Sequence, residues 1–262
     1  MAQKERLSII RQTVKRDKKV SVSALSREHN VTEETIRRDL EKLEQEGLLT
    51  RTYGGAVLNI EKISEHIDYL RRSQTNKAEK VAIGKLAASV IPEKAAIGAD
   101  ASSTVMEAIN LLRDKPDITV LTNSVKIVRE LDQASITIIS TGGIVNNSTF
   151  SMQGNIVRKI LKDYYVDVVL ISCTALEVDG GVYDSNEEEA ELKRVLVDRG
   201  QKIILLADHT KFNKVAFVRV LDFAKLDMVI TDQKPSSDWI EMFKEKGIEL
   251  LYPQENIQPF MA

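Results

Sequence analysis

The 262 residues of the chain suit a small domain joined to a larger one, and the composition, 43% hydrophobic and 29% charged with a net charge of −2, is ordinary for a soluble globular protein. No window offers the ~18 to 20 uncharged apolar residues of a membrane span, and charges interrupt the N-terminal segment, which argues against a secretory signal. The single cysteine, Cys173, excludes an internal disulfide, so we expect a cytoplasmic protein.

The first segments of the chain predict two helices. Residues 3–17 carry apolar side chains at helical spacing with charged residues between them. The segment VSVSALSREH, residues 20–29, opens with serines that favour a helix start. It continues as a short helix whose buried face should be Val22 and Leu25.

A turn, a longer helix and a hairpin are expected next. Asn30 predicts a tight turn, because asparagine tolerates the left-handed region of the backbone. Thr32 is a favourable N-cap for a helix with apolar residues on one face, and Gly47 is expected to end that helix. The pair Gly54-Gly55 lies between two β-prone runs and predicts a hairpin.

This order of elements is that of a winged helix, with a helix-turn-helix at about residues 20–39 inside a domain at 1–58. A helix that reads the major groove needs long polar side chains in its N-terminal half. Arg37 and Arg38 lie about 100° apart around such a helix, so one can reach a base edge while the other reaches a phosphate. The candidate DNA contacts lie at the two helix starts, on the reading helix and beside the wing turn: Ser21, Ser23, Thr32, Glu34, Thr35, Arg37, Arg38, Arg51 and Tyr53.

The charge distribution agrees with DNA binding at one end of the chain. Residues 1–58 carry 12 Lys and Arg against 9 Asp and Glu, whereas the remainder carries 25 against 30. The alternative is a surface helix with pairs of opposite charge four residues apart, such as Glu33 with Arg37 and Glu34 with Arg38. The serine-rich first helix, the turn and the glycine hairpin, which follow in order, favour the DNA-binding interpretation.

The DNA-reading segment also carries a family resemblance. The stretch VSVSALSREHNVTEETIRRDLEKLEQEGLLTRTYGGAV closely resembles the DeoR-type regulators, and the resemblance continues to about residue 231. It implies a C-terminal half similar in fold to ribose-phosphate isomerases and CoA transferases, which usually binds a phosphorylated sugar. It also implies repression of carbohydrate-catabolic operons, with release from DNA when the ligand binds.

The rest of the chain predicts a linker at 59–76 and an α/β sensor domain at 77–262. The linker is polar and largely helical in pattern, and we expect it to pack onto the second domain. The apolar runs AAIGA, ITVLT, ITIIS, VDVVLIS and KIILLA are typical of parallel strands covered by helices on both faces, so the predicted fold is Rossmann-like. Helices are expected at 77–91, 104–112, 124–132, 152–162, 187–199 and 236–246, and strands at 95–99, 118–122, 136–140, 166–172, 202–207, 215–220, 227–231 and 248–251.

A hydroxyl-rich loop between a strand and a helix predicts an anion site. Ser102, Ser103 and Thr104 stand at a helix start, where backbone N–H groups and hydroxyls suit a phosphate. DeoR-type regulators usually show an Asp, then Ser or Gly, Gly or Ser, and two Thr, so Ala101 and Ser102 depart from the pattern after Asp100 and put the ligand specificity in doubt. The alternative is a serine N-cap with no ligand.

Three further strand ends carry small polar residues. Ligands of open α/β sheets bind outside the carboxyl ends of the strands, although each such end taken singly also fits ordinary turn chemistry. Lys77 and Lys211 match lysines of the resembled family and could supply charge for a phosphate. Glu189 and Lys193 could contact sugar hydroxyls or form a surface salt bridge. The candidate effector contacts are Lys77, Asp100, Ser102, Ser103, Thr104, Asn123, Ser124, Gly142, Gly143, Glu189, Lys193, Asp208 and Lys211.

The residues indicate neither a metal site nor a cofactor site nor a catalytic group. His209 lies beside Asp208 without a second partner in sequence, and three scattered histidines with one cysteine give no metal spacing. We expect Cys173 to be buried and inert.

Two alternatives to a regulator are open. One is a sugar-phosphate isomerase or CoA transferase with an added DNA-binding domain; the related isomerases need paired aspartates after the strand at 166–172, where this chain has Ser172-Cys173-Thr174-Ala175. The other is a winged helix used only for protein contacts, which Arg37, Arg38 and Arg51 disfavour. A single small reading domain contacts few base pairs, so we expect a homo-oligomer, a dimer or a tetramer, on double-stranded operator DNA.

Overall fold

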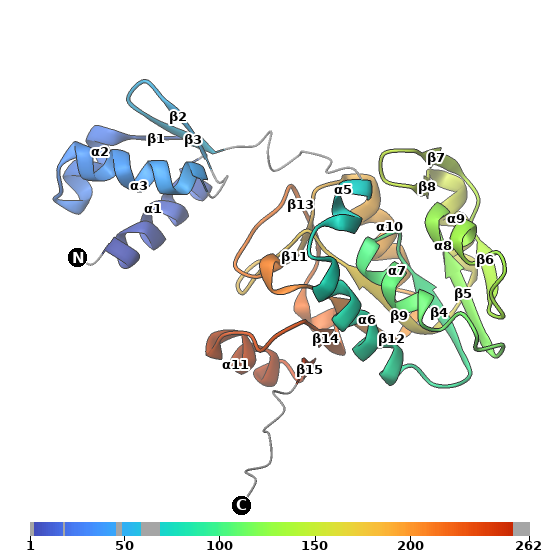
Figure 1. The fold of residues 1–262 in the computed structure, drawn as a ribbon. Coiled ribbons are helices and arrows are strands. Elements are labelled where there is room, and N and C mark those ends of the chain that lie inside the picture. The colour runs from blue at the N-terminus through green and yellow to red at the C-terminus, as the bar shows by residue number, and fades with distance from the viewer. Residues whose placement is uncertain (1–2, 18, 46–48, 59–68, 254–262) are drawn as a thin grey trace, which may run out of the picture. The chain divides into compact units, whose positions relative to one another are not determined.

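A computed structural model describes residues 3–17, 19–45, 49–58 and 69–253. The chain divides into two compact units, Met1–Glu65 and His66–Ala262, drawn in Figure 1. Gly47, expected to end a helix, and residues 59–68 of the expected linker lie outside the described residues. In the part of the chain that is described, no helix is long and apolar enough to cross a membrane.

The N-terminal unit is a winged helix-turn-helix. Its elements are α1 (Gln3–Asp17), β1 (Lys19–Ser21), α2 (Val22–His29), α3 (Glu33–Gln45), β2 (Leu49–Thr52) and β3 (Gly55–Leu58). The predicted core is confirmed, since Val22 and Leu25 are buried, and Asn30 turns the chain with φ of 52°. Strand β1 was not expected: residues 19–21 pair with β3, so the wing is a three-stranded sheet and the helix begins only at Val22.

The second unit is a three-layer α/β/α domain. Its central sheet has seven parallel strands in the order β15-β14-β12-β9-β4-β5-β6. The strands are β4 (Ala95–Ala99), β5 (Ile118–Thr122), β6 (Thr137–Ser140), β9 (Val166–Ser172), β12 (Gly200–Leu206), β14 (Met228–Ile230) and β15 (Glu249–Leu251). The Rossmann-like fold predicted from the apolar runs is confirmed.

Helices cover both faces of this sheet (Figure 1). In β9, Val168 and Leu170 join a core with α6 (Lys77–Val90), α7 (Ser103–Asn110) and α8 (Val125–Glu130), whereas Val169 and Ile171 join a core with α9 (Asn155–Asp163), α10 (Glu187–Val197) and α11 (Ser237–Glu245). This alternation within one strand explains the continuous apolar run, because both faces of the strand are buried.

Short strands and turns make up the remaining elements, and several were not predicted. The hairpin β7 (Ile144–Asn146) and β8 (Ser151–Gln153) takes the residues assigned to the start of a helix at 152, so α9 begins at Asn155 instead. Strands β10 (Ala175–Glu177), β11 (Gly181–Asp184) and β13 (Val218–Leu221) form a separate antiparallel sheet, which corrects the strand expected at 215–220. The rest are α5 (Tyr69–Gln74) and two short 3-10 turns, η1 (His209–Lys211) and η2 (Phe223–Lys225).

Candidate functional site

The reading helix of the N-terminal unit starts on hydroxyl caps. Ser21 Oγ accepts from the Ala24 N–H at 3.0 Å at the start of α2. Thr32 Oγ1 accepts from the Thr35 N–H at 3.3 Å and lies 2.9 Å from Thr35 Oγ1 at the start of α3. These hydroxyls fix the helix starts that the sequence predicted, and Ser23 lies beside Ser21 with its Oγ 3.3 Å away.

The arginines of α3 are exposed and weakly paired. The Arg37 guanidinium lies 2.7 Å from Glu33 and 3.8 Å from Glu34, and Arg38 lies 3.5 Å from Glu34. The ion pairs expected for an ordinary surface helix, Glu33 with Arg37 and Glu34 with Arg38, are therefore present. Exposed pairs of this kind contribute ~0.2–1 kcal/mol each, so a DNA phosphate or base edge can displace the glutamates at small cost.

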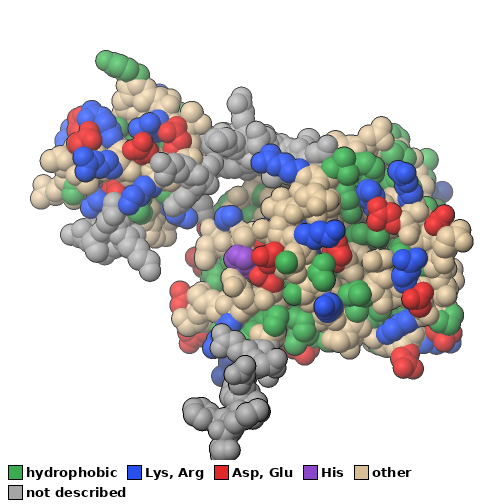
Figure 2. All heavy atoms as spheres, in the orientation of Figure 1, with side chains coloured by type: hydrophobic (Ala, Val, Ile, Leu, Met, Phe, Trp, Pro, Cys, Tyr) green, Lys and Arg blue, Asp and Glu red, His purple; other side chains and the backbone are tan. Residues whose placement is uncertain are grey.

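The wing presents one arginine and one aromatic ring. Arg51 is held by Glu44, with Nε 2.8 Å from one carboxylate oxygen and the backbone N–H 2.9 Å from the other. The Tyr53 side chain at the hairpin tip is fully exposed. Figure 2 shows basic and acidic side chains mixed over the visible face of this unit, in keeping with its small positive balance.

A buried ion-pair network lies at the carboxyl end of the central strands. Lys193 Nζ of α10 lies 2.8 Å from Asp184 Oδ2 and 3.3 Å from Asp100 Oδ2, and all three side chains are less than 9% exposed. Asp100 also accepts from the backbone N–H groups of Ser102 and Ser172, both at 2.9 Å. One ammonium and two carboxylates thus join β4, β9, β11 and α10.

The electrostatics of the network favour full ionisation. Burial by itself raises the pKa of Asp184, but Lys193 outweighs it and holds the pKa of that carboxyl below its usual range. Burial likewise opposes the charge on Lys193, yet Asp184 and Asp100 raise its pKa above the ordinary lysine value. Both groups therefore stay charged in the folded protein at neutral pH.

The surface salt bridge suggested for Glu189 and Lys193 is wrong, because both side chains are buried. Glu189 accepts from Ser151 Oγ and from Gln153 Nε2 of the β7–β8 hairpin instead. Asp100, Asn123, Glu189 and Lys193 do come together, but the cavity they border measures about 10 Å³. That is room for about one water molecule, so these four residues do not enclose a sugar.

The predicted anion loop is a capped helix start. Ser102 Oγ accepts from the Val105 N–H at 3.1 Å, and Ser103 and Thr104 are buried in the first turn of α7. Ser124 caps α8 in the same way, and Asn123 donates to the Met152 carbonyl at 3.2 Å. The serine N-cap is therefore present at Ser102, and an anion at this helix start remains a proposal.

The two glycines after β6 differ in their surroundings. Both have positive φ, 61° at Gly142 and 110° at Gly143. A Cβ at Gly143 would lie 2.7 Å from the Gln153 carbonyl oxygen, so this glycine permits the close approach of β8. Around Gly142 a Cβ would meet nothing within 4 Å, which leaves the backbone there open to a ligand.

Asp208 is a buried carboxylate with one oxygen unused. Its Oδ1 accepts from the Thr210 N–H at 3.0 Å and from Asn76 Nδ2 at 3.2 Å. Its Oδ2 is buried and has no hydrogen-bond partner among the described residues. Burial raises the pKa of Asp208, but the charge of Lys211 and the hydrogen bonds from Thr210 and Asn76 together lower it below the usual range, so the group is ionised.

On helix α6 the structure buries Lys80, whereas Lys77, the lysine predicted as an effector contact, is exposed. Lys77 is exposed in the first turn of α6, and one turn later Lys80 is 5% exposed. Burial, and next the charge of Lys211, lower the pKa of Lys80 to about 8. The signal was available in the sequence, because Lys80 shares a helix face with Ile83, Gly84 and Ala87.

His209 and Cys173, which were not expected to take part in catalysis or metal binding, have ordinary surroundings. His209 Nδ1 lies 2.7 Å from Asp232 Oδ2. Cys173 is buried, as predicted, and burial raises the pKa of its thiol to about 12. Within the described ranges, no three His, Cys, Asp or Glu side chains are grouped so that they could hold a metal ion.

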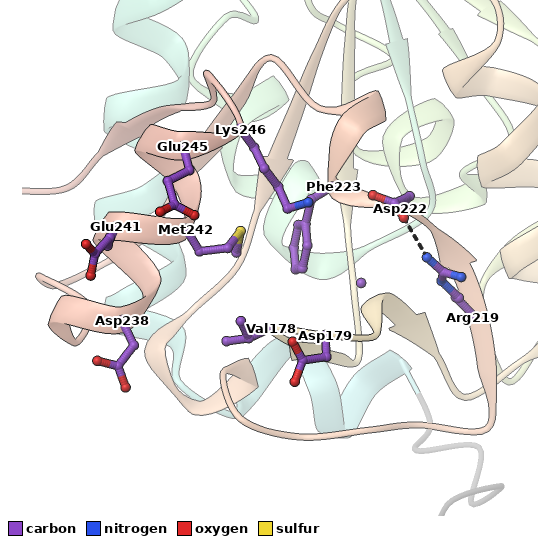
Figure 3. Close-up of a pocket in the computed structure, with 11 residues that line it drawn as sticks. Val178, Asp179, Arg219, Asp222, Phe223, Asp238, Glu241, Met242, Glu245 and Lys246 are labelled. Carbon is purple, nitrogen blue, oxygen red and sulfur yellow. Dashed lines mark hydrogen bonds and ion pairs between the residues drawn. The ribbon is translucent and has the colours of Figure 1, made fainter.

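A larger hollow of about 540 Å³ lies elsewhere, between the β10–β11 turn, the start of η2 and α11 (Figure 3). None of the predicted effector contacts lines it. Its charged lining is mostly carboxylate, with Asp179, Asp238, Glu241 and Glu245 against Lys246 and the paired Arg219 and Asp222. An anionic ligand is disfavoured there, since like charges repel.

Comparison with known proteins covers almost the whole chain. Residues 6–62 match the family described as the DeoR-like helix-turn-helix domain, and residues 75–233 match the DeoR C terminal sensor domain. An uncharacterized HTH-type transcriptional regulator of Bacillus subtilis is 37% identical over 94% of this chain and 95% of its own. The HTH-type transcriptional repressor GlcR of the same organism is 32% identical over 98% of each.

Solved structures give a more distant likeness. Ribose 5-phosphate isomerase A from Methanocaldococcus jannaschii is 14% identical, with a TM-score of 0.40 over 53% of this chain and 55% of the enzyme.

The ion-pair network makes a stability prediction. Lys193→Met leaves Asp100 and Asp184 buried without their cation, so we expect the free energy of unfolding of the sensor unit to fall by ~3–5 kcal/mol at pH 7. Urea unfolding followed by the fluorescence of Trp239, the only tryptophan and a buried side chain of α11, measures it. The matched control is Lys225→Met, which removes an exposed pair with Asp198 and should cost less than ~1 kcal/mol.

The pH dependence of the deficit is a second signature. In the Lys193→Met variant we expect either Asp100 or Asp184 to have a raised pKa. The folded state then binds one proton more than the unfolded state, so stability rises as pH falls toward 4. In the unsubstituted chain the lowered pKa of Asp184 gives the opposite slope, with stability lost as pH falls below about 4. Equal deficits in the two variants at pH 7 would contradict the structural role of Lys193.

Proposed function

The chain belongs to the DeoR family of transcriptional regulators, and on that premise we propose that it represses genes of carbohydrate catabolism and leaves its operator when a phosphorylated sugar or sugar alcohol binds. Curated relatives include a putative aga operon transcriptional repressor of Escherichia coli and an L-fucose operon activator of Haemophilus influenzae. The proposal rests mainly on Asp208, a buried carboxylate whose Oδ2 has no hydrogen-bond partner among the described residues. Lys80 and Lys211 are close enough to Asp208 to interact with it electrostatically. These residues lie near the carboxyl ends of the strands, where ligands of such folds bind. A regulator of this kind works in the cytoplasm, where its operator is.

The DNA-binding part of the proposal rests on α3 and the wing. In this proposal, Arg37 and Arg38 contact base edges and phosphates of the operator, and Thr35 and Glu34 lie beside them. Their exposure and the weakness of their ion pairs support this role. The proposed phosphate contacts at the helix starts are Ser21, Ser23 and Thr32. Those from the wing are Arg51 and Tyr53.

The effector is proposed to lie outside the carboxyl ends of β4, β5, β6 and β12. In this proposal, the phosphate of the effector binds the N-terminus of α7 and Lys211, and a hydroxyl of the effector donates to Asp208 Oδ2. The remaining candidates, Lys77, Asn123, Ser124, Gly142 and Gly143, line the neighbouring strand ends or helix starts. Asp100, Glu189 and Lys193 are proposed to hold the surrounding segments in place, since Lys193 pairs with Asp100 and Asp184 and Glu189 accepts from Gln153.

A catalytic role is not part of the proposal. The segment Ser172-Cys173-Thr174-Ala175 has no carboxylate where the related isomerases would need a pair. The nearest buried carboxylates, Asp100 and Asp184, share the ammonium of Lys193. Both are thereby held as ion-pair partners, which disfavours proton transfer to a substrate.

Substitution of Arg38 tests the DNA contact. Arg38→Ala should weaken operator binding about 5- to 150-fold, because one bidentate base contact is worth ~1–3 kcal/mol. A gel-shift titration gives the affinity, and circular dichroism confirms the fold. The control Arg16→Ala removes the same charge from an exposed position of α1 and should at most reduce the salt slope by about one unit. Unchanged affinity in a folded Arg38→Ala variant would refute the contact.

Paired ligands test the anion site. A sugar phosphate should bind ~10- to 150-fold more tightly than its parent sugar, since a hydrogen bond to a charged group contributes ~1.5–3 kcal/mol. Calorimetry on matched pairs measures the difference. Lys211→Ala should remove most of it, whereas Lys94→Ala, an exposed lysine before β4 at the opposite edge of the sheet, should not. Equal binding of sugar and phosphate would show that the site is not an anion site.

The proposed assembly is a homo-oligomer, a dimer or tetramer. One unit of about 60 residues covers a single half-site, and symmetric pairing of two units gives useful specificity. Sedimentation velocity on the free protein and on operator DNA should show at least a dimer. A monomer under both conditions is the result that would overturn this expectation.

A further inference from the structure

The helix α5 is the first described segment after residues 59–68, which join the DNA-binding unit to the sensor unit. Any change in how firmly α5 is attached therefore acts at the sensor end of that connection. Six residues are too few for a helix to be stable alone, so contacts with the rest of the sensor unit must hold it. α5 packs against α7, and hydrogen bonds and ring contacts attach it further at its start and at its end.

At its start, α5 is attached through an aromatic contact to the β7–β8 hairpin. The Tyr69 N–H donates to the Ser148 carbonyl at 2.9 Å, and the buried Tyr69 ring lies 5.6 Å from the ring of Phe150. The Lys126 ammonium lies 5.1 Å from the Phe150 ring centroid and 5.9 Å from that of Tyr69. The Arg72 guanidinium also lies over the Tyr69 ring, with 5.7 Å between the guanidinium carbon and the ring centroid.

At its end, α5 is attached through groups that belong to that site. The Lys80 ammonium donates to the carbonyls of Arg72 and Thr75, which the end of the helix leaves without partners. Asn76, directly after the last turn, donates to Asp208 Oδ1 and to Thr210 Oγ1 at 3.1 Å. The two anchors, Lys80 and Asp208, are 5% and 1% exposed.

Unused bonding capacity remains on both sides of this junction. Asp208 Oδ2 and Arg72 Nε are buried and have no hydrogen-bond partner among the described residues. The Lys80 ammonium has a third N–H beyond the two carbonyls it serves. Lys80 and Lys211 are like charges close enough to affect one another, so an anion between them relieves repulsion. A phosphate could accept from the free N–H groups of Arg72 and Lys80, and a ligand hydroxyl could donate to Asp208 Oδ2.

We propose that α5 is itself a wall of the effector site, where Arg72 and Lys80 bind the phosphate together with Lys211 and Asp208 accepts from a ligand hydroxyl, so that the bound effector locks α5 against the sensor unit. This inference rests on the proposed function, because it assigns the binding groups and the regulatory consequence of the same site. The sugar phosphate then signals by fixing the segment that leads to the DNA-binding unit.

Hydrogen exchange of the full-length protein tests the lock, with inorganic phosphate as the probe and chloride at equal ionic strength as the reference. Phosphate should slow the exchange of the α5 amides, residues 70–76, at least several-fold. Arg72→Gln should abolish that protection and weaken phosphate binding by at least ~10-fold in calorimetry. Arg72→Lys, which keeps the charge, should retain part of both effects. Trp239 fluorescence verifies that each variant is folded.

The matched control is Arg71→Gln, which removes the same charge from the preceding, exposed position of the same helix. It should keep the phosphate affinity and the protection of α5. Phosphate that binds equally well to the Arg72→Gln variant, or that binds without slowing exchange in α5, overturns this inference and leaves the proposed function standing. Absence of phosphate binding to the unsubstituted chain overturns both, whereas operator binding measured with Arg38→Ala is independent of either outcome.

Discussion

The sensor unit depends on one buried ammonium. Lys193 of α10 joins Asp100, which follows the central strand β4, to Asp184, which ends β11 of the small antiparallel sheet. Without the cation, two carboxylates would lie in the interior without a counter-charge, so the packing of the two sheets with α10 is much less stable when Lys193 is absent. Asp100 in turn receives the N–H groups of Ser102 and Ser172, and the arrangement of the strand ends follows from that network.

The carboxyl ends of the strands thus have one part in which the charges are paired and another in which bonding capacity is unused. Around Asp100 and Glu189 every charge has a partner, and the cavity left between them is of the size of a water molecule. Around Asp208 and Lys80 the opposite holds, since a carboxylate oxygen is unused and two lysines are close together. Unsatisfied buried groups destabilise a folded protein, and Asp208 Oδ2 and Arg72 Nε are the groups that the proposed effector would satisfy.

The sequence predicted the elements whose signals are local. Serine and threonine caps, Asn30 in the left-handed region, the wing glycines and the two-sided apolar strands all depend on residues near one another in the chain. The missed strands β1, β7, β8, β10 and β11 have three or four residues each, too few for a clear alternation, and most acquire their identity from their partners.

Two lysines illustrate why the site was only partly predictable. Glu189 and Lys193, four residues apart, have the spacing of a surface pair, yet both face the sheet edge together with Leu192 and Leu196. Lys80 likewise shares the buried face of α6 with Ile83 and Ala87. In both helices a charged residue continues an apolar stripe, and that position indicates burial. The partners of each buried charge belong to segments far away in sequence. The helical pattern therefore predicts that the lysine is buried, but it does not predict which residues the lysine pairs with.

The modest charge of the DNA-binding unit fits regulation by a small ligand. Glu33 and Glu34 pair with Arg37 and Arg38, and Glu44 pairs with Arg51, so DNA would have to displace these glutamates from the arginines. In the proposed homo-oligomer, two units held at the spacing of two half-sites would supply tight binding. A coupling free energy of ~1–3 kcal/mol is typical of allosteric effectors. Such a coupling lowers affinity about 5- to 150-fold, which is enough to release a regulator whose binding depends on spacing. A site that fixes α5, next to the connection between the units, needs to alter only that spacing and not the reading surface itself.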